Sequence, residues 1–267
     1  SILNTPDVIS ETDKPGNVIR NGKNSSMYMA AGLLRRGEVQ AMVSAGNTGA
    51  LIMIGRHLIK TITGIQKPAI VASIPGTSRQ SYLLDVGANL DCTAEQLFQF
   101  AVMGSILAKS LTASEARVGL LNIGVENHKG TDEVRRAAKI LSECSAVNFI
   151  GFIEANELFE GVADVVVCDG FIGNVTIKSS AGVANVVHKL LAEQLVSGRY
   201  TEAMTAFGAQ INPQRFNGAS LLGLQGSIVK SHGNATVEGF VYAIQQAIRE
   251  VENNVPQLIA ENVAAII

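Results

Sequence analysis

The chain has 267 residues, of which 47% are hydrophobic and 16% are charged, and its formal net charge is −2. Such a chain can bury a sizeable core, which excludes intrinsic disorder, and its near-neutral charge disfavours a nucleic-acid partner. Its three scattered cysteines lack the spacing of metal ligands or of a disulfide framework. We therefore expect no metal, no cofactor and a reducing cytoplasmic setting.

Helices and short apolar strands alternate through the first 110 residues. In chain order we predict a helix over 25–36, a strand over 39–44, a helix over 48–62, strands over 68–73 and 81–86, and a helix from about 93 to 110. The turn over 75–78 joins two of these strands and predicts an antiparallel hairpin. Thr93 and Gln96 match a capping box at the start of the last helix.

The same alternation continues to the end of the chain. We predict strands over 117–122, 148–153, 164–168 and 227–230, helices over 131–144, 174–196 and 236–253, and a short terminal helix from Pro256. The pattern predicts a three-layer α/β fold with a mainly parallel sheet and an antiparallel hairpin. We expect a single α/β domain over residues 1–267, with a helical excursion at about 190–220.

Glycine accompanies Asn, Asp or Lys just after five predicted strands, in residues 44–49, 85–91, 122–130, 169–174 and 231–234. Glycine lets backbone amides approach a ligand, and amides at a helix N-terminus bind anions. Ligands of α/β folds sit beyond the carboxyl ends of strands, so we predict one anion pocket built from these loops. Ordinary strand–helix turns would show the same residues, and that alternative stays open.

Other motifs of catalysis are missing. The chain has no nucleotide-binding lysine loop, no G-x-G-x-x-G after a strand, no G-x-S-x-G elbow and no paired histidines at zinc spacing. Lys129 follows a predicted strand and precedes a helix, where it could add charge to an anion site. His232 lies at another strand end, which favours a functional role.

Several longer blocks carry a family resemblance. Val43–Ala50, Asp85–Asp91, Gln99–Gly104, Val166–Val175, Leu221–Leu224 and Ser231–Gly233 resemble the PlsX-type phosphate acyltransferases, in the family's order. The resemblance implies transfer of a fatty acyl group from acyl-[acyl carrier protein] to inorganic phosphate, for phospholipid synthesis. It also implies a fold similar to the isocitrate and isopropylmalate dehydrogenases, a homodimer, and peripheral membrane contact in some members. Family members carry a further N-terminal block, and this sequence starts after it.

Roles follow for the residues of these loops. We expect phosphate to bind at Ser44, Gly46, Asn47, Thr48 and Gly49, with Asn89 and Asp91 also binding substrate. We expect Lys129 to neutralise the anion, Asn174 and His232 to donate hydrogen bonds, and Asp169 to orient one donor. A weaker second anion site would use Arg20, Ser25 and Ser26.

The reaction itself needs no catalytic serine or cysteine, because phosphate is already an anionic nucleophile and a thiol leaves readily. Three alternatives stay open: a phosphate acetyl- or butyryltransferase that uses coenzyme A thioesters, a dehydrogenase of related fold, and a non-catalytic scaffold at a membrane. The apolar residues Leu191, Leu195, Tyr200, Met204 and Phe207 could guide an acyl chain, rest on a membrane, or pack in a dimer.

Overall fold

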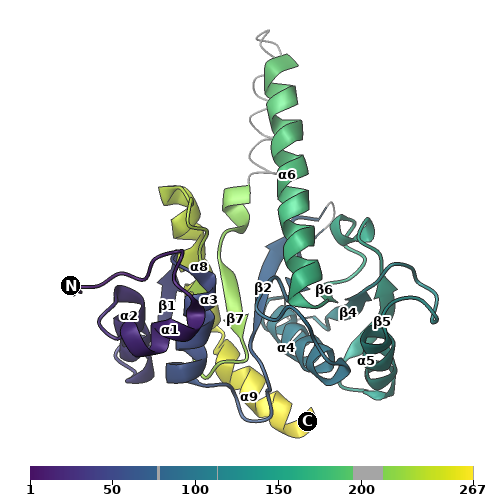
Figure 1. Cartoon of the computed structure of the whole chain (residues 1–267). Helices are drawn as coiled ribbons and strands as arrows, with labels where there is room; N and C mark the ends of the chain where they lie inside the picture. The colour runs from purple at the N-terminus through teal and green to yellow at the C-terminus, as the bar shows by residue number, and fades with distance from the viewer. Residues whose placement is uncertain (77–78, 113, 195–212, 267) are drawn as a thin grey trace.

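A computed structural model describes residues 1–76, 79–112, 114–194 and 213–266. Its sheet has eight strands in the order β1-β8-β7-β2-β3-β6-β4-β5 (Figure 1). The strands are β1 (Ala41–Ser44), β2 (Ala69–Ile74), β3 (Ser81–Leu84), β4 (Arg117–Leu121), β5 (Asn148–Ile153), β6 (Val165–Val167), β7 (Ala219–Leu222) and β8 (Ser227–Lys230). The predicted α/β class and the hairpin of β2 and β3 are therefore confirmed.

The sheet consists of two parallel parts that run in opposite directions. β1 pairs parallel with β8, and β3, β6, β4 and β5 pair parallel with one another. Between them, β7 and β2 make only antiparallel pairs. The carboxyl ends of β1 and β8 therefore lie at one edge of the sheet, and those of β3, β6 and β4 lie at the other.

The two sets of strand ends are nevertheless close along the strand direction. Paired residues put Val43, Val229, Ser220, Val71, Leu84 and Val167 in one row across the sheet. β1 and β8 end one residue beyond this row in one direction, and the loops after β3 and β6 start one residue beyond it in the other. At about 3.3 Å per residue, the two sets are offset by only about 7 Å along the strands.

Helices cover both faces of the sheet. They are α1 (Pro15–Asn21), α2 (Ser26–Arg35), α3 (Thr48–Ile54) with the π-helical turn η1 (Gly55–Ile59), α4 (Ala94–Thr112), α5 (Asp132–Glu143), α6 (Gly170–Gln194), α8 (Val237–Glu252) and α9 (Val255–Ile266). Short 3₁₀ turns are η2 (Glu157–Phe159) and η3 (Pro213–Phe216). α6 extends well beyond the sheet in Figure 1.

Alternation along β2 shows which helices share a face. Ala69 and Val71 pack into one cluster with α4 and α9. Ile70 belongs to a cluster with α1, α2 and α3, whereas Ile74 belongs to a cluster that Ile177 of α6 joins. Residues four apart on a strand point to the same side, so α3 and α6 lie on the same face. This arrangement lets loops from the two parts of the sheet meet above its centre.

Several predicted boundaries need correction. α6 begins at Gly170, four residues before the predicted start, because Asp169 caps it through a 2.8 Å bond from the Ile172 amide. α1 and β7 were not predicted at all. The capping box is confirmed, since the Thr93 amide donates to the Gln96 side chain and the Gln96 amide to Thr93 Oγ1.

Much of the predicted excursion at 190–220 lies outside the described residues. Leu195, Tyr200, Met204 and Phe207 belong to the part that is not described. The single-domain organisation stays a prediction. Within the described part, no helix combines the length and apolarity that a bilayer crossing requires.

One carboxyl group is buried where α8 packs on β7. Glu250 is 2% exposed and accepts hydrogen bonds from Ser220 Oγ and, at 3.2 Å, from Gln246 Nε2. Burial raises the pKa of Glu250 to about 7, although these hydrogen bonds and Arg249 favour the charged form. Because the pKa of this carboxyl is higher in the folded than in the unfolded chain, its contribution to stability is fully present below the unfolded pKa. The contribution is lost as pH rises through the folded pKa.

We predict that Glu250→Gln will change the pH dependence of stability. A shift from 4.5 to about 7 corresponds to about 3 kcal/mol. The unfolding free energy of the variant relative to the original chain should therefore rise by about 3 kcal/mol between pH of about 4.5 and about 8. Urea denaturation at both pH values measures this difference. An identical difference at the two pH values would contradict the prediction.

Candidate active site

The loop after β1 is held by its own side chains. Asn47 Oδ1 caps α3 by accepting from the Ala50 amide at 3.0 Å, and its Nδ2 donates to the carbonyls of Ser10, Glu11 and Asp13. Ser44 Oγ accepts from the Gly46 amide at 3.2 Å. Asn47 is buried and fully used in these contacts. Asn47, one of the predicted phosphate ligands, therefore holds the loop in shape. Thr48 and Gly49, two others, are half-buried in the first turn of α3.

The loop after β8 lies directly beside it. The Ser231 amide donates to the Ser44 carbonyl at 2.9 Å. Asn217, which is buried, donates to Ser231 Oγ and accepts from the His232 amide at 2.9 Å. The structure therefore brings His232 next to the 44–49 loop, as a single pocket requires.

Two basic side chains, Lys230 and His232, accompany this loop. Lys230, the last residue of β8, is half-buried and donates from Nζ to the Ser231 carbonyl. Burial lowers the pKa of Lys230, and the nearby charge of Glu11 partly opposes this effect. His232 keeps much of its surface exposed, but partial burial lowers its pKa as well, and the charges of Lys230 and Lys178 add to the effect.

In the other part of the sheet, Asp85 organises the loop after β3. It is fully buried, and its carboxylate accepts from the amides of Ile70, Ala88 and Asn89 and from Asn89 Nδ2. Asn89 Nδ2 also donates to the Pro68 carbonyl at 2.8 Å. Burial raises the pKa of Asp85 despite these bonds. Asn89, predicted to bind substrate, therefore holds this loop in shape.

The first turn of α6 rests on that loop. The Gly170 amide donates to the Asn89 carbonyl at 2.7 Å, and a Cβ on Gly173 would lie 1.9 Å from the Asp85 carbonyl oxygen. Only glycine permits so close an approach. A Cβ on Gly87 would lie 3.5 Å from the Asn174 side chain, so Asn174 lies against the 85–91 loop. Asp169 caps α6 and thereby fixes its first turn.

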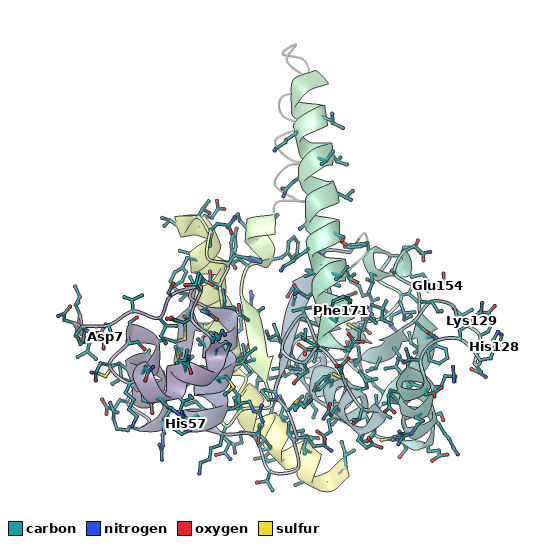
Figure 2. The ribbon with its side chains drawn as sticks, viewed as in Figure 1. Asp7, His57, His128, Lys129, Glu154 and Phe171 are labelled. Atoms are coloured by element: carbon teal, nitrogen blue, oxygen red, sulfur yellow. The ribbon has the colours of Figure 1, made fainter. Side chains whose placement is uncertain are left out.

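Lys129 lies in the loop after β4, which is tied together by Asn122. Asn122 Nδ2 donates to the carbonyls of Gly124 and Lys129. Figure 2 shows Lys129 beside His128 at the outer side of the molecule, with Phe171 nearer its middle at the base of α6. Within the described residues, Lys129 forms no ion pair.

The predicted pocket is therefore divided within one chain. β1 and β4 are six strand spacings apart, which corresponds to about 28 Å at about 4.7 Å each. The structure does not place Lys129 beside the 44–49 loop. β4 neighbours β6, so Lys129 belongs with Asp169 and Asn174, which follow β6.

Contacts at the sheet centre join the two groups of loops. Val86 packs against both the cluster under α3 and the cluster under α6. Lys178, one turn beyond Asn174 on α6, acts electrostatically on His232. The space between α3, the 231–234 loop and the start of α6 therefore gathers backbone amides and the positive groups Lys230 and Lys178. This combination suits an anion.

The second predicted anion site receives less support. Ser25 is buried, caps α2 and donates to the Gly22 carbonyl at 2.6 Å, so its hydroxyl is already used. The Ser26 amide donates to the Asp7 carbonyl at 3.3 Å. Arg20 is exposed in the last turn of α1. Asp91 is also exposed, just before α4.

The cysteines near the site are poor nucleophiles. Burial raises the pKa of Cys92 to about 12, and burial also raises the pKa of Cys168, with the charges of Asp85 and Asp169 adding to both effects. A thiol reacts as its thiolate, so neither group is poised for covalent catalysis. Among the described residues, no three His, Cys, Asp or Glu side chains gather as metal ligands would.

The site residues that sequence reasoning missed are Lys230, Lys178 and Asp85. Lys230 directly precedes Ser231 and His232 at a strand end, so its position could have identified it. Asp85 begins the block Asp85–Asp91, but the sequence does not indicate that its carboxyl group is buried. Lys178 lies within a helix, and only the packing of α6 brings it near His232.

Comparisons with known proteins identify the family of this chain. A family model described as "Fatty acid synthesis protein" matches residues 1–258. A phosphate acyltransferase of Shewanella woodyi is 44% identical over 276 aligned residues, covering 100% of this chain and 81% of that protein. One of Pseudomonas fluorescens is 48% identical, covering 96% of this chain and 79% of that protein.

Solved structures share the fold at low identity. EutD phosphotransacetylase from Staphylococcus aureus has a TM-score of 0.58 at 16% identity, covering 88% of this chain and 68% of its own. A branched-chain phosphotransacylase from Enterococcus faecalis has a TM-score of 0.58 at 16% identity, covering 85% and 79%. A 4-hydroxythreonine-4-phosphate dehydrogenase from Klebsiella pneumoniae has a TM-score of 0.53 at 14% identity, covering 84% and 69%.

We predict that Lys178→Gln will raise the pKa of His232. Removing one positive charge favours the protonated imidazole, while the contribution of burial remains, so the pKa should move only part of the way to 6.5. NMR titration of the ring protons measures this, with the signal assigned from a His232→Gln spectrum.

Lys189→Gln is the matched control, because this exposed lysine lies 11 positions further along α6, about 16 Å away at about 1.5 Å per residue. It should leave the His232 titration unchanged. Equal titration curves for all three proteins would show that α6 does not approach the 231–234 loop.

Proposed function

The chain belongs to the fatty acid synthesis protein family, together with the bacterial phosphate acyltransferases, and we propose that it transfers a fatty acyl group from acyl-[acyl carrier protein] to inorganic phosphate. The observation that carries this proposal is the convergence of amide-rich loops with Lys230 and Lys178 between α3 and α6. The acyl phosphate formed would supply phospholipid synthesis. The enzyme would act in the cytoplasm.

The proposed reaction is a direct displacement at the thioester carbonyl. A phosphate oxygen forms a bond to the carbonyl carbon, giving a tetrahedral intermediate whose oxygen carries negative charge. The carbon–sulfur bond then breaks, and the thiolate leaves and takes a proton from solvent. The raised thiol pKa values of Cys92 and Cys168 support a route without a covalent enzyme intermediate.

The residues divide into two tasks in this proposal. The Gly46 amide already donates to Ser44 Oγ, so the amides of Thr48 and Gly49, with Ser44, hold phosphate. Lys230 and His232 stand beside them. Asn174 and Lys129 stabilise the oxyanion from the other part of the sheet, and Asp169 orients the turn of α6 that carries Asn174.

A second copy of the chain is part of the proposal. α6 exposes Val183, Val186, Val187 and Leu190 on one side, with Val183 at 64%. A contiguous apolar surface on a projecting helix favours burial against a partner. We propose a homodimer joined along this stripe, with peripheral membrane contact beyond it.

We predict that Lys129→Ala will abolish most acyl phosphate formation while leaving the fold intact. Loss of one oxyanion donor typically lowers kcat by about 100- to 1,000-fold. Lys230→Gln should instead raise the KM for phosphate more than it lowers kcat, because it touches the nucleophile. A hydroxylamine assay for acyl phosphate measures both, with Lys139→Ala, an exposed lysine of α5, as control. Full turnover by Lys129→Ala would overturn its assignment.

We predict that the acyl-carrier thioester will be the preferred donor. Palmitoyl-[acyl carrier protein], palmitoyl-coenzyme A and acetyl-coenzyme A should be compared at equal concentrations, and kcat/KM should be highest for the first. Higher kcat/KM with a short coenzyme A thioester would favour a phosphate acetyltransferase instead. Absence of turnover with all three, alongside vesicle binding, would favour a scaffold.

We predict that Val183→Glu with Val186→Glu will convert a dimer into a monomer. Charges on the stripe would be costly to bury, whereas both positions tolerate charge in water. Light scattering after size exclusion measures the mass. Asn185→Glu, on the opposite side of α6, is the matched control and should remain dimeric. A dimer in both variants would place the interface elsewhere.

A further inference from the structure

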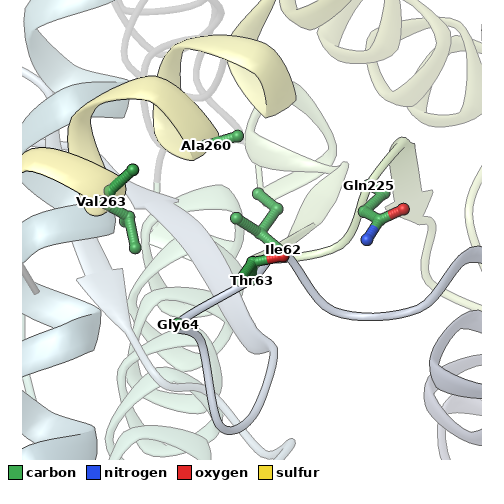
Figure 3. A pocket seen from close by; sticks show the side chains of 7 residues that line it. Ile62, Thr63, Gly64, Gln225, Ala260 and Val263 are labelled. Atoms are coloured by element: carbon green, nitrogen blue, oxygen red, sulfur yellow. The ribbon is translucent and has the colours of Figure 1, made fainter.

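A cavity lies beneath α9, at the far end of the helix that begins at the 44–49 loop. It has a volume of about 440 Å³, and its walls are the segment Ile62–Gly64, Gln225, and Ala260, Val263 and Ala264 of α9. Figure 3 shows Ala260 and Val263 of α9 facing Ile62, Thr63 and Gly64. The volume falls within the range of small-molecule sites, about 300–1,000 Å³.

The lining of this cavity is mostly apolar, with Thr63 and Gln225 as its polar members. Ile62 and Val263 are 4% and 1% exposed, and alanines form the rest of the α9 wall. Gly64 has a φ of 90°, and a Cβ there would come within 3.2 Å of Val263 Cγ1. The glycine therefore lets the loop approach α9 closely and form one wall of the cavity. Such walls suit a hydrocarbon chain.

A second cavity of about 250 Å³ shares Gln225 with the first. Its walls include Leu34 and Arg35 of α2, and Leu58, Ile59 and Lys60 at the end of η1. Within the described residues, neither Arg35 nor Lys60 takes part in an ion pair. An apolar cavity thus adjoins one with two positive groups.

Lys60 holds a strained backbone at this junction. Its φ of 65° and ψ of 160° fall in a region that is almost restricted to glycine. The strain is maintained by bonds from the Lys60 amide to the Gly55 carbonyl and from the Gln225 amide to the Lys60 carbonyl, both 3.0 Å. Gln225 Nε2 also donates to the Thr61 carbonyl at 3.0 Å. Strain of this kind persists where the surroundings enforce it, commonly at ligand sites.

We propose that the two cavities form one binding site for a long-chain fatty acid, with the hydrocarbon chain under α9 and the carboxylate at Arg35 and Lys60. An arginine and a lysine match a carboxylate in charge, and arginine can bind both of its oxygens. A neutral lipid would leave both cations unused.

This site goes beyond the proposed acyl transfer. The seven residues of α3 and five of η1 separate it from the phosphate loop by about 18 Å at about 1.5 Å per residue. A fatty acid bound there would report the supply of the chains that the enzyme is proposed to transfer.

Binding can be measured directly by calorimetry with dodecanoate and dodecyl phosphate below their critical micelle concentrations and with dodecanol below its solubility limit. Dodecanoate should bind with one site per chain and at least tenfold more tightly than dodecanol. Equal affinities for the acid and the alcohol would overturn the assignment of the cations. Tighter binding of dodecyl phosphate than of dodecanoate would contradict a fatty acid as the occupant.

Matched variants locate the site. Ala264→Trp, at an exposed position of α9, should fill the apolar cavity and weaken dodecanoate binding at least tenfold, whereas the neighbouring Ala265→Trp should not. Arg35→Gln should weaken binding of the acid but not of the alcohol, and Arg36→Gln, whose arginine pairs with Glu38, should change neither.

Lys60→Gly separates binding from stability. It removes a charge and the strain together, so it should weaken dodecanoate binding while leaving the melting temperature unchanged or higher. Dodecanoate binding that survives both Ala264→Trp and Lys60→Gly would overturn the proposal. Because the readout is binding, Lys129→Ala protein should give the same titration, and absence of acyl transfer would leave this result standing.

Discussion

The site depends on the reversal of strand direction at the centre of the sheet. β7 and β2 pair antiparallel with their neighbours, so the two parallel parts point their carboxyl ends to opposite edges. Because the strands are short and share one row, these ends are offset by only about 7 Å along the strand direction. α3 and α6 then lie on the same face, and the loops meet over the centre. A fully parallel sheet would instead gather all of these loops along one edge of the sheet.

Buried polar side chains give these loops their shape, and this use limits what they can do chemically. Asp85 satisfies three amides and one side chain, and Asn47 caps a helix while holding three carbonyls. A buried polar group without partners is costly, so these contacts are part of the fold. The groups left for a ligand are backbone amides and the positive side chains around them. That division is consistent with binding an anion by preorganised dipoles, not by a titrating acid or base.

Burial also separates ionisable groups by role. Cys92 and Cys168 keep their protons because low exposure disfavours a thiolate beside Asp85 and Asp169. His232 is driven toward its neutral form by partial burial and by two lysines, so it can donate one hydrogen bond near neutral pH. Burial likewise raises the pKa of Glu250 where α8 packs on the sheet.

The order of most helices and strands, the hairpin, the capping box at Thr93 and the loops that carry Gly46, Asn89 and His232 were predictable from local pattern, whereas α1, β7 and the early start of α6 were not. The predictable features depend on neighbours within a few residues, which a sequence displays directly. Strand direction, the division of Lys129 from the 44–49 loop, and the approach of Lys178 to His232 were not predictable. They depend on which strands pair across the sheet and on how α6 packs, and those contacts join residues far apart in the chain. The sequence by itself therefore determined the parts of the site, and only the tertiary structure decided which of them meet.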